Sequence, residues 1–261
     1  MLKEIKPIKI ARYDQLTVKV YATKEEMGQA AAQEAAAAFR TMLSQKGQPV
    51  NMVFSTGASQ FAFVAALKEA GIDWQKVHAY HLDEYVGISS DHPASFRLWL
   101  RQRVDQPLQP AAFNYIEGDA ADTDAECRRY EALLKANPID IGYVGIGENG
   151  HIAFNDPPAD FNDSRWVKVV ELDMVCRRQQ VGEGWFATID DVPKYAISQT
   201  VPAIMSFRKI ISVVPEARKA EAVRRTLTGP ISPTCPASIL RTHPDALLML
   251  DADSAALIDI G

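Results

Sequence analysis

The sequence predicts the α/β fold class, with a mostly parallel sheet that helices cover on both faces. Short apolar runs, as in Val50–Phe54 and Val77–His81, are typical of strands that are buried on both sides. These runs alternate along the chain with helical patterns, which is the order found in parallel sheets. A chain of 261 residues, 47% of them hydrophobic, can bury such a core. No repeat or break in composition divides it, so we predict one domain over residues 1–261, a Rossmann-like open sheet.

The first half of the chain alternates between strand and helix patterns. Residues 17–21 alternate polar and apolar side chains, as in a strand with one exposed face. Residues 24–43 are rich in alanine and lack proline, which favours a long helix. After the buried strands Val50–Phe54 and Val77–His81, helical patterns follow at 61–70, 95–103 and Thr123–Ala136.

The second half continues this alternation around an apolar segment, residues 139–144, that reads as a central strand. Val167–Glu171 is rich in valine and is predicted to be another strand. Val201–Met205 is predicted to be a short buried helix. The last predicted elements are a strand at 210–214, a helix at 217–227 and a strand at 246–250.

The composition excludes several kinds of partner. A net charge of −5 and a pI near 5.6 argue against nucleic acid or an anionic membrane as partner. The three cysteines, Cys127, Cys176 and Cys235, are far apart and odd in number, so neither a disulfide framework nor a cysteine metal site is expected. The N-terminus is too polar for a signal peptide, and no apolar run reaches transmembrane length. We therefore expect a cytoplasmic protein.

The most informative segment comes after the central strand, at residues 145–157. Its glycines allow sharp turns where the strand ends, and in open parallel sheets ligands bind at that end. A histidine there, with an acid five residues further on, predicts a site of acid–base chemistry. The polar side chains that this segment presents are Glu148, Asn149, His151, Asn155 and Asp156.

Two other interpretations of this segment are an ordinary polar loop and a dinucleotide site. Residues 145–150 match the pattern G-x-G-x-x-G, which binds dinucleotides only when a helix comes directly after it. Asn155, Pro157 and Pro158 make such a helix improbable. A polar loop does not require the run from Gly147 to Asn155, so we favour a catalytic loop.

Three more candidate elements lie where predicted strands end. The small residues at 55–59, three of them with hydroxyl groups, have two interpretations: an anion cradle, or simple capping of a helix. For Asp83 and Glu84 the alternatives are a carboxylate that shuttles a proton and a solvated turn. For Lys219, at the start of a predicted helix, they are a phosphate contact and a surface charge. Taken together, these elements predict acid–base chemistry on a phosphorylated metabolite.

Two motifs resemble the glucosamine-6-phosphate deaminase (isomerase) family: Leu82-Asp-Glu-Tyr-Val-Gly87 and the segment from Gly145 to Pro157. The likeness extends to residues 55–57, residues 192–196 and Lys219. The sister family of 6-phosphogluconolactonases usually carries Asp-Glu-Arg in the first motif and lacks the Ile-Ala-Phe-Asn run of the second. Both differences favour the deaminase side.

The resemblance implies an enzyme that converts glucosamine 6-phosphate and water to fructose 6-phosphate and ammonia. Asp83 would be the base that moves the C2 proton to C1. His151, paired with Asp156, would open the sugar ring, and Asn149 occupies the third ring-opening position. Many relatives carry Asp at the position of Asn149 and Glu at that of Asp156. An amide can orient a histidine but supplies no charge.

The resemblance also implies substrate contacts. Glu84 is expected to contact the sugar, and either Arg177 or Arg178 to supply an arginine. No metal or other cofactor is expected. The phosphate would be held by Thr56, Gly57, Ala58, Ser59 and Lys219.

Three rival functions are compatible with the same likeness. One is hydrolysis of a phosphorylated sugar lactone, and another is deamination of galactosamine 6-phosphate. The third is a non-catalytic sugar-phosphate sensor, which would need a DNA-binding module. About 16 residues precede the first predicted strand, too few for a helix-turn-helix. The expected partner is a small phosphorylated amino sugar, bound by a monomer or a small homo-oligomer.

Overall fold

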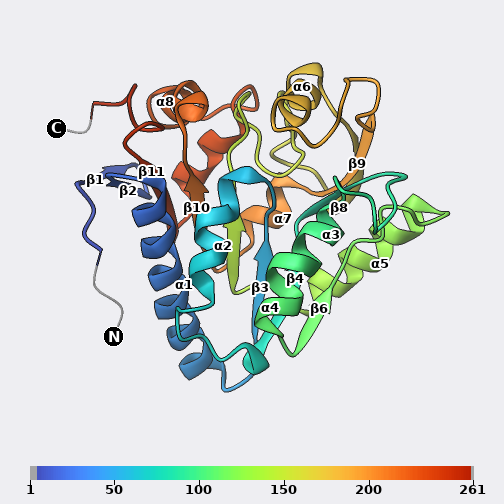
Figure 1. Cartoon of the computed structure of the whole chain (residues 1–261), viewed down its shortest axis with the longest axis horizontal. Coiled ribbons are helices and arrows are strands. Elements are labelled where there is room, and N and C mark those ends of the chain that lie inside the picture. The colour runs from blue at the N-terminus through green and yellow to red at the C-terminus, as the bar shows by residue number, and fades with distance from the viewer. Residues whose placement is uncertain (1–4, 260–261) are drawn as a thin grey trace.

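An eight-stranded sheet lies at the centre of the computed structural model, which describes residues 5–259 (Figure 1). Every pair of neighbouring strands in it is parallel except the edge pair, which is antiparallel. The predicted mostly parallel sheet is confirmed. In spatial order the strands are β1 (Lys9–Tyr13), β2 (Leu16–Tyr21), β11 (Ala246–Asp251), β10 (Lys209–Val214), β7 (Ile141–Val144), β3 (Val50–Phe54), β4 (Val77–His81) and β6 (Ala112–Asn114).

Helices cover both faces of this sheet, because successive side chains of each strand point to opposite sides. Met52 and Phe54 of β3 pack among the helices of one face, whereas Val53 packs among those of the other. The first face carries α1 (Lys24–Lys46), α2 (Phe61–Leu67), α3 (Phe96–Leu100) and α4 (Gln106–Leu108). The second carries α5 (Thr123–Ala136), α7 (Val201–Met205) and α8 (Ala220–Thr228).

Local sequence explains the bounds of the long first helix. The Thr23 hydroxyl accepts a hydrogen bond from the Glu26 amide at 3.1 Å, which is an N-cap. Gly47 ends α1 in the left-handed conformation, with φ of 60°. The alanines between these caps let α1 approach α2 and the sheet closely.

A second, three-stranded antiparallel sheet was not predicted. It consists of β5 (Asp83–Tyr85), β9 (Tyr195–Gln199) and β8 (Val167–Glu171), beside α6 (Met174–Gly182). Val167–Glu171 is a strand as expected, but it belongs to this sheet and not to the large one. β5 and β6 are too short to show a period in the sequence. Strands β1 and β9 and helix α6 were also missed.

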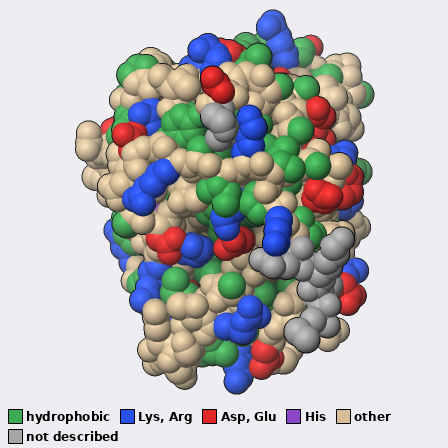
Figure 2. Space-filling model, turned by 90° about the vertical axis from the view of Figure 1, so that its left-hand side faces the viewer, with side chains coloured by type: hydrophobic (Ala, Val, Ile, Leu, Met, Phe, Trp, Pro, Cys, Tyr) green, Lys and Arg blue, Asp and Glu red, His purple; other side chains and the backbone are tan. Residues whose placement is uncertain are grey.

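One edge of the large sheet is formed by β1, and the side chains of Ile10 in this strand and of Ile8 just before it are exposed. Figure 2 shows the left-hand side of Figure 1, where apolar, basic and acidic side chains are interspersed. Charged residues such as Lys9 and Arg12 discourage pairing of this edge with another strand. Within the described range, no helix is long and apolar enough to cross a membrane. The single domain predicted for residues 1–261 includes ends outside that range and stays a prediction.

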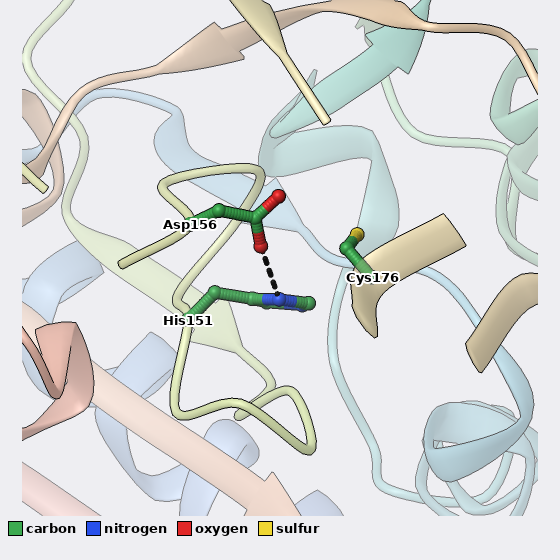
Figure 3. Close-up of side chains that lie close together, drawn as sticks. All are labelled: His151, Asp156 and Cys176. Atoms are coloured by element: carbon green, nitrogen blue, oxygen red, sulfur yellow. Dashed lines mark hydrogen bonds and ion pairs between the residues drawn. The ribbon is translucent and has the colours of Figure 1, made fainter. Parts of the chain in front are cut away.

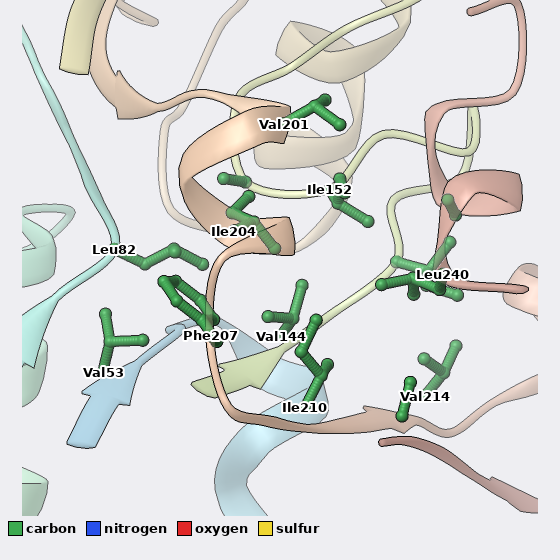
Figure 4. Packing of buried hydrophobic residues seen from close by; sticks show 14 of the residues in the cluster. Val53, Leu82, Val144, Ile152, Val201, Ile204, Phe207, Ile210, Val214 and Leu240 are labelled. Atoms are coloured by element: carbon green, nitrogen blue, oxygen red, sulfur yellow. The ribbon is translucent and has the colours of Figure 1, made fainter. Parts of the chain in front are cut away.

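The core around Phe207 connects the large sheet to the loop that comes after β7 (Figure 4). Ile152 of that loop is fully buried in the same cluster as Ile204 and Phe207. Phe207 lies directly over Gly142 of β7, where an added Cβ would be 2.2 Å from the ring. The absence of a side chain at Gly142 therefore fixes how closely the ring packs on the sheet.

We predict that Gly142→Ala destabilises the protein by about 1–3 kcal/mol, because the Phe207 ring cannot move without repacking its neighbours. Urea unfolding would measure the change. Gly182→Ala is the matched control, since an added Cβ there meets nothing within 4 Å. Equal stability of the two variants would contradict this account of the core.

Candidate active site

A cavity of about 540 Å³, including its open mouth, lies at the carboxyl ends of β3, β4, β7 and β10. All four elements singled out in the sequence contribute to it, because the ends of neighbouring parallel strands meet at one edge. The lining residues are Ser55, Thr56, Gly57, Ser59, Leu82, Asp83, Phe96, Gly145, Ile146, Gly147, His151, Ala153, Phe154, Gln179, Gln180, Glu183 and Lys219.

His151 and Asp156 form a hydrogen-bonded pair within one loop (Figure 3). The Nδ1 atom of His151 lies 2.9 Å from Oδ1 of Asp156. Burial opposes the charge on Asp156, but hydrogen bonds from His151, Asn149 and the Asp173 amide outweigh it and lower its pKa. An ionised carboxylate only accepts, so Nδ1 carries a proton and the Nε2 atom of neutral His151 can accept one.

Asn149 holds this pair in place without lining the cavity. Its Nδ2 atom donates to Asp156 at 2.8 Å and to Asp173 at 2.9 Å, and its Oδ1 accepts from the His151 amide at 2.9 Å. Asp173 also caps α6, accepting from the Cys176 amide. An amide at this position therefore links the loop to α6 through two carboxylates, which a third carboxylate would repel.

The loop approaches its own histidine closely at Gly147. A Cβ at that position would lie 2.3 Å from Nε2 of His151, so any larger residue would push the ring aside. Residues 151–166 contain turns and an isolated bridge but no helix, so the G-x-G-x-x-G pattern lacks the helix that dinucleotide binding requires.

Asp83 faces the cavity from the first residue of β5. Its carboxyl makes no hydrogen bond or ion pair with any other of residues 5–259. Burial, with a smaller contribution from the charge of Glu84, raises the pKa of Asp83 to about 8. A carboxyl with that pKa can take and return a proton near neutral pH.

Glu84 points the other way, because adjacent residues of a strand face opposite sides. Its carboxylate accepts from the Ser95 hydroxyl at 2.9 Å and from the amides of Phe96 at 3.1 Å and Arg97 at 2.8 Å, at the start of α3. It is fully buried and does not line the cavity. The predicted substrate contact of Glu84 is therefore corrected: this residue anchors α3 to β5.

Lys219 is the cationic counterpart of Asp83. It lies at the end of a 3-10 turn, Ala217–Lys219, lines the cavity and is only 3% exposed. No ion pair or hydrogen bond joins its ammonium group to the described part of the chain. Burial lowers the pKa of Lys219 to about 8. An unpaired buried ammonium is costly, so this site favours an anionic ligand.

The turn at residues 56–60 lines the same cavity as Lys219 and has the geometry of an anion cradle. Gly57 has φ of 99°, a conformation that favours glycine, and a 3-10 turn over Ala58–Gln60 comes directly after it. Thr56, Gly57 and Ser59 line the cavity, whereas Ala58 does not. The hydroxyls and backbone amides of this turn suit an anion held against Lys219.

The predicted arginine contacts are not supported. The Arg177 guanidinium is buried and donates to the carbonyls of Ile189 at 2.6 Å and Val192 at 3.1 Å, and Arg178 is exposed. Neither lines the cavity. The arginine next to the cradle is Arg218, which contacts three carboxylates at Glu148, Glu183 and Glu216.

The sequence prediction missed three lining residues on and just after α6: Gln179, Gln180 and Glu183. Gln179 accepts from the Glu148 amide at 3.1 Å, and Gln180 accepts from the Tyr85 hydroxyl at 2.8 Å. Both bonds attach α6 to elements far away in the chain. The only indication in the sequence is that these polar residues come after Asp173, a residue type that commonly caps the start of a helix, and this does not predict that they line a cavity.

Cys176 points from α6 toward the His151–Asp156 pair (Figure 3). One ligand atom from each of the three residues lies within 4.8 Å of the others, which makes them a possible metal-ligand group. However, both oxygens of Asp156 accept hydrogen bonds, and burial raises the pKa of the Cys176 thiol well above its usual value. The donors therefore suit a hydrogen-bonded pair beside a neutral thiol better than a cation.

Comparison with known proteins identifies the family. A family model described as glucosamine-6-phosphate isomerases/6-phosphogluconolactonase matches residues 22–249. The chain belongs to this family. A glucosamine-6-phosphate deaminase of Listeria innocua is 37% identical over 212 residues, or 81% of this chain and 89% of that protein. One of Bacillus cereus is 35% identical over 204 residues, or 78% of this chain and 76% of that protein.

Solved structures show the same fold. A monomeric glucosamine-6-phosphate deaminase has a TM-score of 0.85 at 33% identity, covering 92% of this chain and 99% of that one. A 6-phosphogluconolactonase from Trypanosoma brucei has a TM-score of 0.77 at 16% identity, covering 96% and 100%. The second likeness concerns the fold alone.

We predict that Asn149→Asp slows turnover and costs about 1–3 kcal/mol of stability, because it replaces two donated hydrogen bonds with like-charge repulsion. Repulsion favours the protonated form of the new carboxyl, so the loss should be smaller at pH 5 than at pH 8. Activity and thermal unfolding at both pH values would test this. Asn162→Asp, on the exposed surface, is the control. A fully active and stable Asn149→Asp variant would contradict the role assigned to the amide.

Proposed function

We propose that this enzyme converts a hexosamine 6-phosphate, most readily glucosamine 6-phosphate, and water into a ketose 6-phosphate and ammonia. The observation that carries the proposal is the pair of unpartnered buried groups, Asp83 and Lys219, which face one cavity together with His151 in the described structure. A phosphorylated sugar offers an anion to the lysine and an acidic C–H bond to the carboxylate. The 33–37% identity to deaminases supports the same substrate class.

The phosphate of the substrate would bind between Lys219 and the turn at Thr56–Ser59. This end of the cavity supplies an ammonium, hydroxyls and backbone amides. Binding energy gained there orients the reacting end of the sugar toward Asp83 and His151.

His151 would open the pyranose ring. Its Nε2 atom accepts the proton of the anomeric hydroxyl and returns a proton to the ring oxygen as the C1–O bond breaks. The charge that His151 gains is stabilised by Asp156, and Asn149 fixes the orientation of both. Asp156 and Asn149 do not line the cavity, so they would act through His151 as positioning residues.

Asp83 would then isomerise the open-chain sugar. Its carboxylate removes the C2 proton as O1 gains a proton, which leaves an enolamine, and then returns the proton to C1 as the nitrogen loses one, which gives an imine at C2. Water adds to C2, the nitrogen gains a proton, and ammonia leaves with the electron pair of the C–N bond as the C2 hydroxyl loses its proton to become the ketone. The products are fructose 6-phosphate and ammonia when the substrate is glucosamine 6-phosphate.

Related activities in the family are the alternatives to this proposal. The 6-phosphogluconolactonase from Trypanosoma brucei is 16% identical to this chain, below the 33% of the deaminase structure. Four points stay predictions. They are the preference for the gluco over the galacto epimer, the absence of a cofactor, the cytoplasmic location, and a monomeric or small oligomeric state. The deaminase of known structure is described as monomeric.

We expect Asp83→Asn to lower turnover by ~10²–10⁴-fold, as is typical for loss of a general base, and to abolish solvent-proton exchange at C1 of fructose 6-phosphate. Between pH values of about 4 and 8, Asp83 is ionised in the unfolded chain but keeps its proton in the folded protein, so the wild type loses stability as the pH rises through this range. Asn at this position does not titrate and avoids this loss. The variant should therefore be at least as stable at pH 8. Asp91→Asn, at a side chain that is 81% exposed, is the control. Near-normal turnover would remove Asp83 from the mechanism.

Lys219→Met should raise the Michaelis constant for the phosphorylated sugar at least tenfold, because the cradle loses its only charge that has no partner among residues 5–259. It should also raise stability at pH 7 by on the order of 1–3 kcal/mol, because burying an unpaired ammonium disfavours folding. That gain should shrink as the pH rises from about 8 to 10.5, where the lysine loses its proton in both states. Lys76→Met at the surface serves as control. Unchanged affinity would place the phosphate elsewhere.

A further inference from the structure

Glu183 places a carboxylate inside the anion cradle. It comes directly after α6, lines the cavity, and its side chain is only 6% exposed. Its Oε2 atom lies 3.8 Å from the position of a Cβ built on Gly57. Its Oε1 atom lies 2.8 Å from the Arg218 guanidinium, next to Lys219 in the chain. The carboxylate therefore lies between Gly57 and Arg218, its charge also acts on Lys219, and it lines the cavity where the proposed phosphate would bind.

This carboxylate is charged and well supported. Oε1 accepts from Gln179 at 2.8 Å as well as from Arg218, and Oε2 accepts from the Trp185 indole at 3.1 Å. Burial opposes the charge, but Arg218 and the hydrogen bond from Gln179 outweigh it and lower the pKa of Glu183. At neutral pH the cradle thus already contains an anion that belongs to the chain itself.

A phosphate dianion entering the cradle meets this charge at short range. Two anions cannot share such a partly desolvated site without a large loss of affinity. We propose that Glu183 is a resident anion that occupies the phosphate position in the free enzyme, and that a ligand phosphate must displace it. The inference rests on the proposed function, since it assumes that the cradle binds the phosphate of the substrate.

Displacement of Glu183 also changes the state of Arg218. In the free enzyme that guanidinium is held by Glu148, Glu183 and Glu216, and it does not line the cavity. Loss of one of its three carboxylates leaves guanidinium donors free for the incoming phosphate. Glu183 would thus set the affinity for phosphorylated ligands by competing with them both for the cradle and for Arg218.

The test is calorimetric binding of inorganic phosphate at pH 7 to the full-length wild type, Glu183→Gln and Glu148→Gln. We expect Glu183→Gln to bind phosphate about tenfold more tightly, a change of about 1.4 kcal/mol. Glu148→Gln is the matched control, because Glu148 contacts the same guanidinium at 3.2 Å but does not line the cavity. It should change the dissociation constant less than twofold.

A second measurement uses the wild type alone. Trp185 donates to Glu183, so phosphate binding should change the Trp185 fluorescence, identified by comparison with Trp185→Phe. Equal or weaker phosphate binding by Glu183→Gln, or unchanged Trp185 emission at saturating phosphate, would overturn the inference. If Glu183→Gln binds phosphate more tightly but the wild type releases no ammonia from any hexosamine 6-phosphate, the inference stands and the proposed function fails.

Discussion

Two ionisable groups of opposite charge, Asp83 and Lys219, are buried in one cavity without partners in the described structure. Each costs folding free energy, so the rest of the fold must hold them there. The parallel sheet does so: β4 leads into Asp83 after a single residue, and β10 leads into the turn that ends at Lys219. Because the pKa of each group is shifted to about 8, both can exchange a proton near neutral pH. A substrate with an anionic end and an acidic C–H bond complements both.

Two sets of contacts position the loop after β7. In the core, Ile152 of the loop is buried in the same cluster as Phe207, and the ring of Phe207 packs on Gly142 of the sheet. At helix α6, Asn149 of the loop donates hydrogen bonds to both Asp156 and Asp173 and so joins the loop to the start of the helix. These contacts hold His151 in place, so the ring opening that we propose would not have to begin with ordering of the loop. Gln179 hydrogen-bonds both the Glu148 amide of this loop and the carboxylate of Glu183, just after helix α6, and so connects the loop to the turn at Gly57.

Strand ends could be located from the sequence, whereas side-chain directions could not. Asp83, His151 and Lys219 could be grouped in advance because the carboxyl ends of neighbouring parallel strands share one edge. Glu84 could not be assigned correctly, since a strand of three residues gives no period from which to read its orientation. The sequence alone presents Asn149 as the replacement of an acid that many relatives carry, and only its two carboxylate partners in the structure explain why an amide suits this position. Glu183 lies in a segment without a motif, and only tertiary packing brings it to Gly57.

The most direct test of the central claim is a comparison of reactions catalysed by one purified preparation. Ammonia and ketose 6-phosphate would be assayed with glucosamine 6-phosphate and galactosamine 6-phosphate, and acid release with 6-phosphogluconolactone. The geometry of Asp83 and His151 predicts equimolar ammonia and fructose 6-phosphate from glucosamine 6-phosphate, with little acid release from the lactone. Lactone hydrolysis without ammonia release from either hexosamine phosphate would contradict the account.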